Sequence, residues 1–432
     1  MTERAGRSVE RLTADIVVVG AGPAGIAAAT RAAGAGKEVL VLDEGMREGG
    51  QIWRHRVPEQ LPDEARERIS GFQMDGIAHR SGVSVVGSPR EGELLAEDRD
   101  GAVLGVRWRD ALILAVGGRE RFLPFPGWTL PGVVGVGGGQ ALLKAGIRVS
   151  GWNTVVAGSG PLLLPVAALL AKSGATPEVV AEQAPQGRVV GFTLGLWRSP
   201  GKLMEGLRYR AAFRTSPYRF GWWVSSAAGD GRVEEVTLTN GRKEETHPCQ
   251  FLCVSYGLVP ATELPRSMGC ETTSEGVVAV DEWQRTSLPG VYCAGETTGV
   301  AGVESSLVEG AVAGLAAAGR ESEARSLFGS RDKQRAFGER LDATFRLRDE
   351  LKSLAMPSTP VCRCEDVTME RLEACSSVRE AKVLTRAGMG PCQGRVCGPA
   401  LSALFGWDLD RVRPPVTPMR AGSLAALDPD GD

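Results

Sequence analysis

The chain has 432 residues, too many for one ordinary domain and enough for about three. Charged residues make up 24% and hydrophobic residues 43%, which is typical of a soluble globular protein. The net charge of -2 excludes a strong overall attraction to nucleic acid or to acidic membranes.

Neither the N-terminal residues nor the apolar stretches indicate export or a membrane span. The first fifteen residues, through Asp15, are charged and polar, so we expect no signal sequence. The longest apolar stretch, at about 155–171, is interrupted by glycines and prolines, whereas a membrane span needs about 20 mostly apolar residues. Because cysteines without a signal sequence indicate a reducing compartment, we expect a cytoplasmic protein.

The first nucleotide-binding pattern begins at a buried strand predicted over Ala14–Val19. The turn Gly20-Ala21-Gly22-Pro23-Ala24-Gly25 follows at once, and an alanine-rich helix is expected from about Pro23 to Ala35. A second strand, Glu38–Leu42, ends at Asp43. Strand, glycine turn, helix and acid together predict a β–α–β unit that binds a dinucleotide.

Each glycine of this turn has a physical task. Gly20 permits the tight turn, Gly22 lets a pyrophosphate approach the backbone, and Gly25 lets the helix pack closely on the strand. The helix N-terminus presents free N–H groups and about half a positive charge to the phosphates. Asp43 can accept hydrogen bonds from the ribose hydroxyls.

Later segments decide between FAD and NAD, because both cofactors use this unit. Gly49-Gly50-Gln51 follows the second strand, and a strand at Ala111–Leu114 runs into Ala115-Val116-Gly117-Gly118. Gly290–Glu296 precedes a helix of small residues expected from about Ser305 to Ala318. At these points the chain resembles flavoproteins with two dinucleotide-binding domains, relatives of thioredoxin reductase and of pyridine nucleotide–disulfide oxidoreductases.

This resemblance implies FAD. In that family the glycine-glycine-glutamine turn lies beside the flavin, and a glycine–acid pair at a late strand end contacts the ribityl chain. Glu296 stands where the family usually has aspartate, so the extra methylene could move or abolish that contact. The FAD-binding residues predicted are Gly20, Gly22, Pro23, Ala24, Gly25, Asp43, Glu44, Gly50, Gln51, Ala115, Gly117, Gly295 and Glu296.

A second unit of similar form follows. A strand at Thr154–Ala157 leads into Gly158-Ser159-Gly160-Pro161-Leu162-Leu163 and an apolar helix, and a strand at Glu178–Val180 ends in Ala181-Glu182. Leu163 stands where the third glycine belongs, and Glu182 would favour NADH over NADPH because a carboxylate repels a 2′-phosphate. Either a second nucleotide (NAD(H), or ADP or ATP) binds at Gly158, Gly160 and Glu182, or the fold is kept while nucleotide binding is lost.

The segment 188–219 carries seven basic residues and one acidic residue, with aromatic residues between them. Such interleaving can bind single-stranded nucleic acid. Nothing else in the chain indicates nucleic acid, so we interpret the segment as a partner contact or a solvated face.

Disulfide reduction by a thioredoxin-reductase-like enzyme needs a Cys-x-x-Cys pair beside the flavin, and this chain has none. Cys249 and Cys253 lie in a strand-like run, Cys249–Tyr256, that places them on one face about 13 Å apart. Both are expected in the core, as are Cys270, Cys293 and Cys375. The pattern argues against disulfide reduction.

The C-terminal cysteines follow a charged helical stretch, Glu321–Lys352. They form a Cys-x-Cys pair and, about 27 residues later, a Cys-x-x-x-x-Cys pair among glycines. Four thiolates can bind zinc or a [2Fe–2S] cluster, but zinc ligands are usually spaced by two to four residues. Arg363, Arg386 and Arg395 would offset the charge of a cluster. The predicted ligands are Cys362, Cys364, Cys392 and Cys397.

This segment resembles the [2Fe–2S] domain of bacterioferritin-associated ferredoxins, a small helix–turn–helix unit. The predicted fold is therefore α/β, with two Rossmann-like dinucleotide-binding domains of the pyridine nucleotide-disulfide oxidoreductase type and a small helical C-terminal domain. The expected boundaries are 13–145 and 258–325 for the FAD domain, 150–257 for the second nucleotide-binding-like domain, 326–357 for a connector, 358–410 for the cluster domain and 411–432 for a tail.

The combination resembles one family in particular. With the segment Gly118–Trp128, the FAD unit and the cysteine segment are similar to the α-type subunits of hydrogen cyanide synthase, opine dehydrogenases, and proline or hydroxyproline dehydrogenases. The α subunit of heterotetrameric sarcosine oxidase shares part of the pattern. The resemblance covers about residues 13–405, and its most specific parts are Pro126-Gly127-Trp128 and the cysteines.

The resemblance implies an electron relay. In that family a flavoprotein β subunit oxidises the C–N bond of an amino or imino acid, and the α subunit passes the electrons on through FAD and the cluster. We accordingly assign no catalytic residue to this chain. A self-contained NAD(P)H-dependent reductase and a non-catalytic FAD-binding scaffold subunit remain alternatives.

Overall fold

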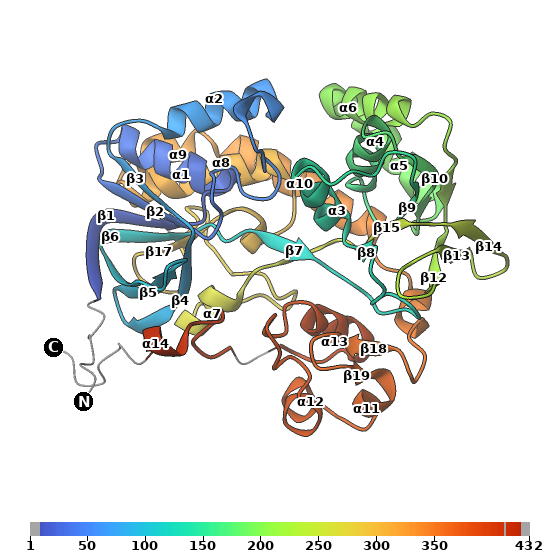
Figure 1. Cartoon of the computed structure of the whole chain (residues 1–432). Coiled ribbons are helices and arrows are strands. Elements are labelled where there is room, and N and C mark those ends of the chain that lie inside the picture. Colours follow the sequence, from blue (N-terminus) through green and yellow to red (C-terminus); the bar gives the residue numbers. More distant parts are fainter. Residues whose placement is uncertain (1–8, 410–411, 425–432) are drawn as a thin grey trace. The chain divides into compact units, whose positions relative to one another are not determined.

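The computed structural model describes residues 9–409 and 412–424 of the chain (Figure 1). These residues divide into two compact units. The first contains the residues up to Arg119, Pro260–Gly338 and the C-terminal residues 412–424, and the second contains Glu120–Val259 and Glu339–Leu409. Of the predicted tail, residues 411 and 425–432 lie outside the description, as do residues 1–8.

The first unit is built on a sheet in which seven described strands pair in the order β3-β2-β1-β6-β5-β4, with β17 beside β6. The pairs among β3, β2, β1, β6 and β17 are parallel, whereas β5 and β4 return antiparallel. The strands are β1 (Glu10–Val19), β2 (Val39–Asp43), β3 (Ile77–Ser81), β4 (Val83–Arg90), β5 (Glu93–Asp98), β6 (Val103–Leu114) and β17 (Val291–Cys293).

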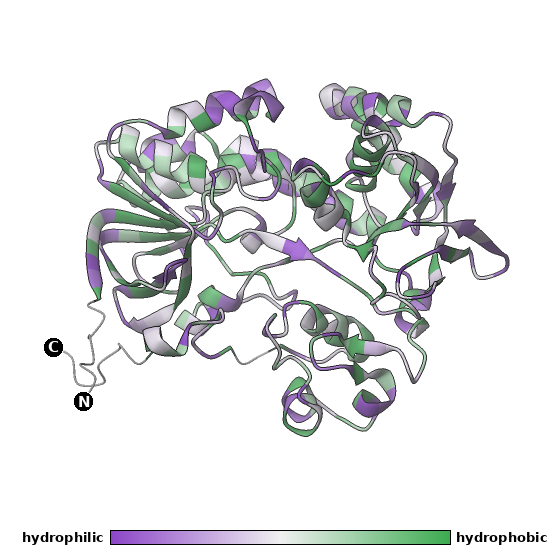
Figure 2. Cartoon of the chain, viewed as in Figure 1, coloured by the Kyte–Doolittle hydropathy of each residue, from purple (hydrophilic) through white to green (hydrophobic). Residues whose placement is uncertain are grey.

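Both faces of this sheet are buried. Ile16 and Val18 belong to a core cluster shared with the helices, while their neighbours Val17 and Val19 belong to a second cluster that includes residues of β4 and β5. A parallel strand covered on both faces reads as a continuous apolar run, as Ile16–Val19 does. The strands of this sheet are largely green, and so hydrophobic, in Figure 2.

Helices α1 (Pro23–Gly34) and α8 (Val303–Ala317) pack against one another unusually closely. A Cβ atom added at Gly310 would lie 2.1 Å from the carbonyl oxygen of Ala24, and one added at Gly314 would lie 2.2 Å from that of Ala28. Only glycine fits such contacts. The first unit also contains α2 (Asp63–Phe72), α7 (Glu263–Met268), α9 (Glu321–Arg325), α14 (Ala421–Leu424), η1 (Pro58–Gln60) and η3 (Gly295–Thr298).

The second unit has its own parallel sheet, in the order β11-β10-β9-β15-β8, which confirms the predicted second dinucleotide-binding fold. An antiparallel sheet of β12, β13 and β14 accompanies it. The strands are β8 (Val133–Val134), β9 (Asn153–Gly158), β10 (Thr176–Glu182), β11 (Tyr218–Phe220), β12 (Trp223–Ala228), β13 (Glu235–Thr239), β14 (Glu244–Pro248) and β15 (Phe251–Ser255). The helices beside them are α3 (Val136–Lys144), α4 (Leu163–Lys172), α5 (Gln186–Gly195), η2 (Leu196–Arg198) and α6 (Pro200–Ala212).

The prediction that Cys249 and Cys253 share one face of a strand is wrong. Strand β15 begins only at Phe251, and the backbone N–H of Cys249 donates to Glu234 beside the antiparallel sheet. The two thiols consequently lie in different core clusters. Cys253, Cys249, Cys270 and Cys293 are buried as predicted, but Cys375 is partly exposed.

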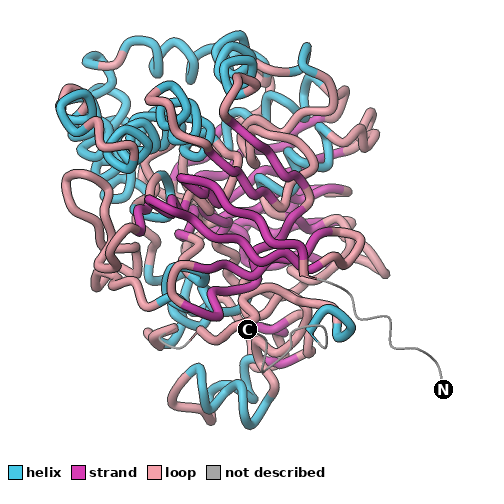
Figure 3. Tube along the Cα trace, turned by 90° about the vertical axis from the view of Figure 1, so that its left-hand side faces the viewer, coloured by secondary structure: helices cyan, strands magenta, loops and turns pink. Residues whose placement is uncertain are grey.

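The stretch predicted as a helical connector contains α10 (Phe328–Phe345), followed by η4 (Asp349–Ser353). The cysteine segment then forms a two-stranded sheet and short helices, which Figure 3 shows from a second direction, around a core that includes Val361, Val367 and Leu401. Its elements are β18 (Pro360–Cys362), β19 (Val367–Thr368), α11 (Met369–Glu373), α12 (Val378–Thr385) and α13 (Cys397–Phe405). Elsewhere β7 (Gly118–Glu120) pairs with β16 (Leu258–Pro260).

Among the residues described, no helix is both long and apolar enough to cross a membrane.

The contact between α1 and α8 predicts a strong effect of a small substitution. Gly314→Val should lower the free energy of unfolding by about 1–3 kcal/mol, because the side chain overlaps the backbone of α1. Urea unfolding followed by circular dichroism measures this. Gly191→Ala on α5 is the control, since nothing lies within 4 Å of its added Cβ atom. An equal stability of Gly314→Val and wild type would contradict the close packing.

Candidate functional site

The first glycine turn has the geometry that its sequence predicts. Gly20 has a φ of +104°, and a Cβ atom there would lie 2.3 Å from the carbonyl oxygen of Ala115. At Gly25 an added Cβ atom would lie 1.7 Å from the carbonyl oxygen of Gly20. No larger residue fits either position, so strand β1 passes directly into the N-terminus of α1.

Two distant segments meet this turn. Gly50 has a φ of +60°, and its added Cβ atom would lie 2.9 Å from the Cα atom of Gly22. The backbone N–H of Gly49 donates to Ala21 over 2.7 Å. From the far end of the unit, Gly295 approaches Ala24, with 2.8 Å between its added Cβ atom and the Ala24 Cβ atom. These two segments contact the N-terminus of α1, and Ala115 contacts Gly20 just before it, so three of the predicted segments meet at this turn.

Asp43 lies at the end of β2, and only one of its two carboxylate oxygens accepts a hydrogen bond in the described structure. Its Oδ1 atom accepts a hydrogen bond from the backbone N–H of Gly45 over 3.1 Å, whereas the buried Oδ2 atom has no partner among the described residues. Burial raises the pKa of this carboxyl. A buried carboxylate oxygen without a donor costs free energy that a ribose hydroxyl would offset. This atom therefore fits the predicted ribose contact.

Other predicted residues are placed differently. The exposed Gln51 side chain accepts from the Arg54 guanidinium over 3.0 Å, and Glu44 is exposed. The carbonyl oxygen of Gly117 accepts from the backbone N–H of Ala261 and from the Thr297 hydroxyl, which ties the end of β6 to two later segments. The contacts therefore bring the predicted glycines together, whereas the Gln51 side chain is exposed and bonded to Arg54.

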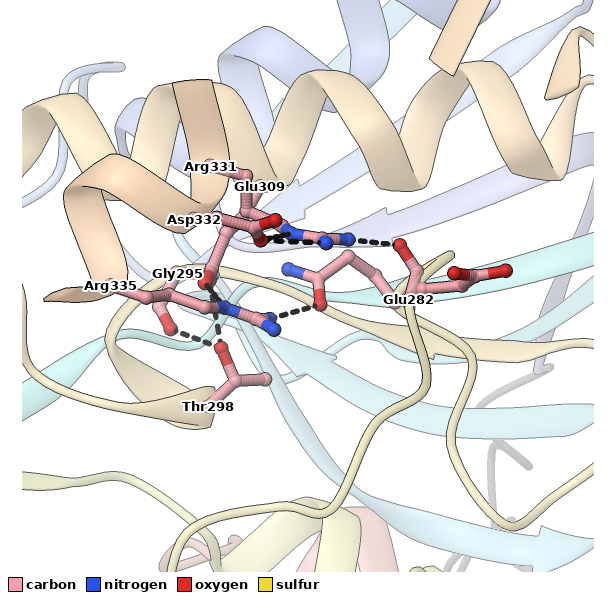
Figure 4. Close-up of polar contacts among 8 residues, drawn as sticks. Glu282, Gly295, Thr298, Glu309, Arg331, Asp332 and Arg335 are labelled. Carbon is pink, nitrogen blue, oxygen red and sulfur yellow. Dashed lines mark hydrogen bonds and ion pairs between the residues drawn. The ribbon is translucent and has the colours of Figure 1, made fainter. Parts of the chain in front are cut away.

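A buried acid that the sequence analysis missed holds the turn at Gly295 (Figure 4). Glu309 of α8 is only 3% exposed. Its Oε2 atom accepts from the backbone N–H of Gly295 over 3.0 Å and lies 2.8 Å from the Thr298 hydroxyl. Its Oε1 atom accepts from Nε of Arg335 on α10 over 2.9 Å. Glu296, whose pKa burial raises, extends from this same turn.

One signal in the sequence could have identified Glu309. It is a charged residue inside a helix predicted from small residues, and such a helix is buried on most sides. A buried carboxylate needs charged or N–H partners, so its presence there indicates a structural network. The partner Arg335 could not be read from the pattern.

The second glycine turn differs from the first. A Cβ atom at Gly158 would lie 1.8 Å from the carbonyl oxygen of Ser255, so the tight turn is kept. The fully buried Glu182 accepts from the backbone N–H groups of Gly160 and Ala184, each over 2.8 Å, and burial raises its pKa to about 7. Leu163 is buried at the start of α4, within the unit's core.

The four C-terminal cysteines line one pocket of the second unit. The thiols interact with one another within this pocket: Cys362 with Cys397, Cys364 with Cys392, and Cys392 with Cys397. The hydrogen bond from Cys397 and several backbone N–H groups lower the pKa of Cys362 to about 6. Within the described part of the chain, no group of three or more His, Cys, Asp or Glu side chains is arranged to hold a metal ion. The pocket is lined by Cys362, Arg363, Cys364, Cys392, Val396 and Cys397.

Glycines shape this pocket. The backbone N–H of Gly388 donates to Sγ of Cys362 over 3.5 Å, and a Cβ atom at Gly390 would lie 2.3 Å from the Cβ atom of Cys364. Of the arginines predicted to offset the charge of a cluster, Arg386 pairs with Glu365 over 2.7 Å. Arg363 lies over the Trp128 ring at 5.7 Å.

The comparisons with known proteins agree with this geometry. The family model for pyridine nucleotide-disulphide oxidoreductases matches residues 14–197 and 206–318. The chain belongs to this family. It is therefore an oxidoreductase with the dinucleotide-binding folds seen in both units.

Named relatives of this pyridine nucleotide-disulphide oxidoreductase match almost the whole chain. The HcnB subunit of hydrogen cyanide synthase from Pseudomonas aeruginosa is 32% identical, over 92% of this chain and 92% of the relative. An opine oxidase subunit from Agrobacterium tumefaciens is 30% identical, over 96% of this chain and 92% of the relative. The resemblance to α-type subunits of this kind is confirmed.

Solved structures share the fold. L-proline dehydrogenase from P. horikoshii has a TM-score of 0.68 at 19% identity, over 96% of this chain and 80% of that one. Thioredoxin reductase from T. acidophilum has a TM-score of 0.56 at 23% identity, over 71% of this chain and 98% of that one.

Glu309 gives a test of the first site. Glu309→Gln keeps the shape but leaves Arg335 without its ion pair, so the turn at Gly295 should loosen and FAD should be held about 10-fold more weakly, which corresponds to about 1.4 kcal/mol. Equilibrium dialysis of FAD and the flavin absorbance spectrum measure this.

Glu321→Gln is the matched control for this measurement, since it removes an exposed ion pair with Arg285 in the same unit. Surface pairs of this kind contribute about 0–1 kcal/mol to stability. Equal FAD retention in the Glu309 and Glu321 variants would show that the buried pair does not position the turn.

Proposed function

We propose that this chain is an electron-transfer flavoprotein subunit of a multi-subunit FAD-dependent dehydrogenase or oxidase that acts on an amino or imino acid. The C–N bond is oxidised in a partner subunit, and the electrons pass through FAD and a [2Fe–2S] cluster held by this chain. The observation that carries the proposal is the presence of both sites in one chain: a dinucleotide site with an unpartnered buried carboxylate oxygen, and a pocket lined by four cysteines.

The residues of the first unit suit FAD. Gly22 is the N-cap of α1, and the N–H groups of the helix's first turn would hold a pyrophosphate there. Asp43 offers its unpartnered Oδ2 atom to the ribose, and Glu296, which follows Gly295 in η3, is the acid predicted for the ribityl chain. Bound FAD supplies two-electron chemistry that can also proceed in one-electron steps.

The arrangement of the cysteines favours a cluster over zinc. Structural zinc is bound by four ligands arranged tetrahedrally around one ion. The four thiols here line one pocket and come from a Cys-x-Cys and a Cys-x-x-x-x-Cys pair, a ligand set that suits a [2Fe–2S] cluster and a spacing unusual for zinc. The N–H of Gly388, which donates to Cys362, is the kind of backbone donor that tunes cluster sulfurs.

A multi-subunit enzyme is supported by the names of the relatives. The HcnB protein and the opine oxidase relative are each named as one subunit of an enzyme. We extend this to a heteromeric complex in which a flavoprotein β subunit carries the substrate pocket. This assignment leaves no catalytic residue to be placed in the present chain.

The second unit exposes large apolar side chains, as expected of a surface that contacts a partner subunit. The large apolar side chains of Leu194, Trp197 and Met204 are 71%, 69% and 64% exposed, on or beside helices α5 and α6. Large apolar side chains left exposed on neighbouring elements are typical of an interaction surface. The basic residues of the same segment, 188–219, would favour an acidic surface on that partner.

Cys392→Ser tests the relay. The variant should keep FAD, because its change lies in the second unit, but should lose the cluster and with it the transfer of electrons to an outside acceptor. Iron and sulfide analysis, the rhombic EPR signal of the reduced protein, and dye reduction by the co-purified complex measure these effects.

Cys375→Ser is the control, as Cys375 lies in the same C-terminal segment but outside the pocket. It should keep iron, EPR signal and activity. Undiminished dye reduction by Cys392→Ser would remove the cluster from the route, and stoichiometric zinc without iron in the wild type would overturn the cluster assignment.

A further inference from the structure

The second glycine turn is closed, in contrast to the first. Gly158, Ser159 and Gly160 are all buried, whereas Gly20 and Gly22 are partly exposed. Within the second unit the N–H of Gly160 is already bonded to the acid at the end of β10, and both oxygens of that acid have partners. The groups that would bind phosphate and ribose are therefore satisfied by the chain itself.

The remaining polar groups of the turn bind the end of the helical connector. The Ser159 hydroxyl donates to the carbonyl oxygen of Phe345 over 2.9 Å. The Nε2 atom of Gln183 donates to the carbonyl oxygens of Phe345 and Arg346, each over 3.2 Å, and to Ser159 over 2.9 Å. Both donors are buried.

These hydrogen bonds satisfy a backbone carbonyl group at the C-terminal end of α10. Phe345 is the last residue of α10, and the last carbonyl groups of a helix have no partner within it. Gln183 and Ser159 supply such a partner to Phe345, as a C-terminal cap does. Of the polar side-chain atoms in this group, Gln183 Oε1 alone lacks a partner in the described structure.

The Phe345 side chain covers the turn. A Cβ atom added at Gly160 would lie 4.0 Å from Cγ of Phe345. The same ring packs edge-on against Phe192 of α5, with 5.7 Å between the ring centroids. An aromatic ring thus lies over the glycine that a pyrophosphate would approach.

Beyond Phe345 the chain stays on the second unit as far as the cysteines. The Arg348 guanidinium lies over the Trp223 ring at 4.6 Å, and Leu351 is fully buried in the core beside it. At the end of this path, Nε1 of Trp128 donates to the carbonyl oxygen of Pro360 over 2.6 Å, two residues before Cys362. The segment from Phe345 to Pro360 is therefore held at its start, middle and end.

We propose that the second glycine turn is a binding site for the chain's own connector, so that this dinucleotide fold holds the cysteine segment in place and takes no nicotinamide or adenine nucleotide. The role given to the cysteine segment rests on the proposed function. The contact itself does not, and its tests require no cluster.

Hydrogen–deuterium exchange of the full chain tests the contact. Gln183→Ala removes two hydrogen bonds to the connector, so amides of residues 346–354 should exchange at least about 10-fold faster than in the wild type. Gln250→Ala is the control, because Gln250 accepts a backbone hydrogen bond from Asn153 at the opposite end of β9. Ser159→Ala gives a smaller change of the same kind should Gln183→Ala fold poorly. Unchanged exchange in both connector variants would overturn the proposal.

Equilibrium dialysis with NADH, ADP and ATP tests the closure. The wild type should show no saturable binding below about 1 mM, equivalent to less than about 4 kcal/mol, and anaerobic NADH should leave the flavin absorbance unchanged. A micromolar dissociation constant for any of the three would overturn the proposal. Protein that lacks iron but gives the expected exchange and dialysis results would reject the proposed function while leaving this inference intact.

Discussion

The first site depends on the contact between α1 and α8. Gly310 and Gly314 let the two helix backbones approach to a distance that any side chain would prevent. That approach brings strand β17 and the turn at Gly295 to the N-terminus of α1, although the two segments are separated by most of the chain. Glu309, on the same helix as the glycines, then fixes the turn through Gly295 and Arg335. Helix α8 thus provides both the glycines that pack closely on α1 and the acid that positions the turn at Gly295.

The two β–α–β units share one backbone arrangement but differ in what their glycine turns contact. Each has a strand, a tight glycine turn and an acid at the end of its second strand. In the first, Asp43 keeps an unpartnered oxygen beside a partly exposed turn. In the second, Glu182 has both oxygens bonded and Phe345 lies over the turn. The difference lies in side chains and in the connector, and the strand topology is common to both.

Most of what is local could be predicted from the sequence. The glycine turns, the strands that precede them and the cysteine spacing are set by neighbouring residues, so they could be read from the pattern. Contacts between distant residues could not: Gln183 meets Phe345 across 162 positions, and no periodicity indicates this. The face predicted for Cys249 is wrong because its backbone belongs with the antiparallel sheet, a tertiary effect that overrides strand propensity.

The most direct test of an electron relay is rapid-freeze EPR of the co-purified complex after anaerobic addition of amino or imino acids. A substrate of the partner subunit should reduce flavin first and then produce the rhombic signal of a reduced [2Fe–2S] cluster. The isolated chain should stay oxidised with the same compound. Reduction of the isolated chain by that compound, or a complex that turns over without any cluster signal, would contradict the relay.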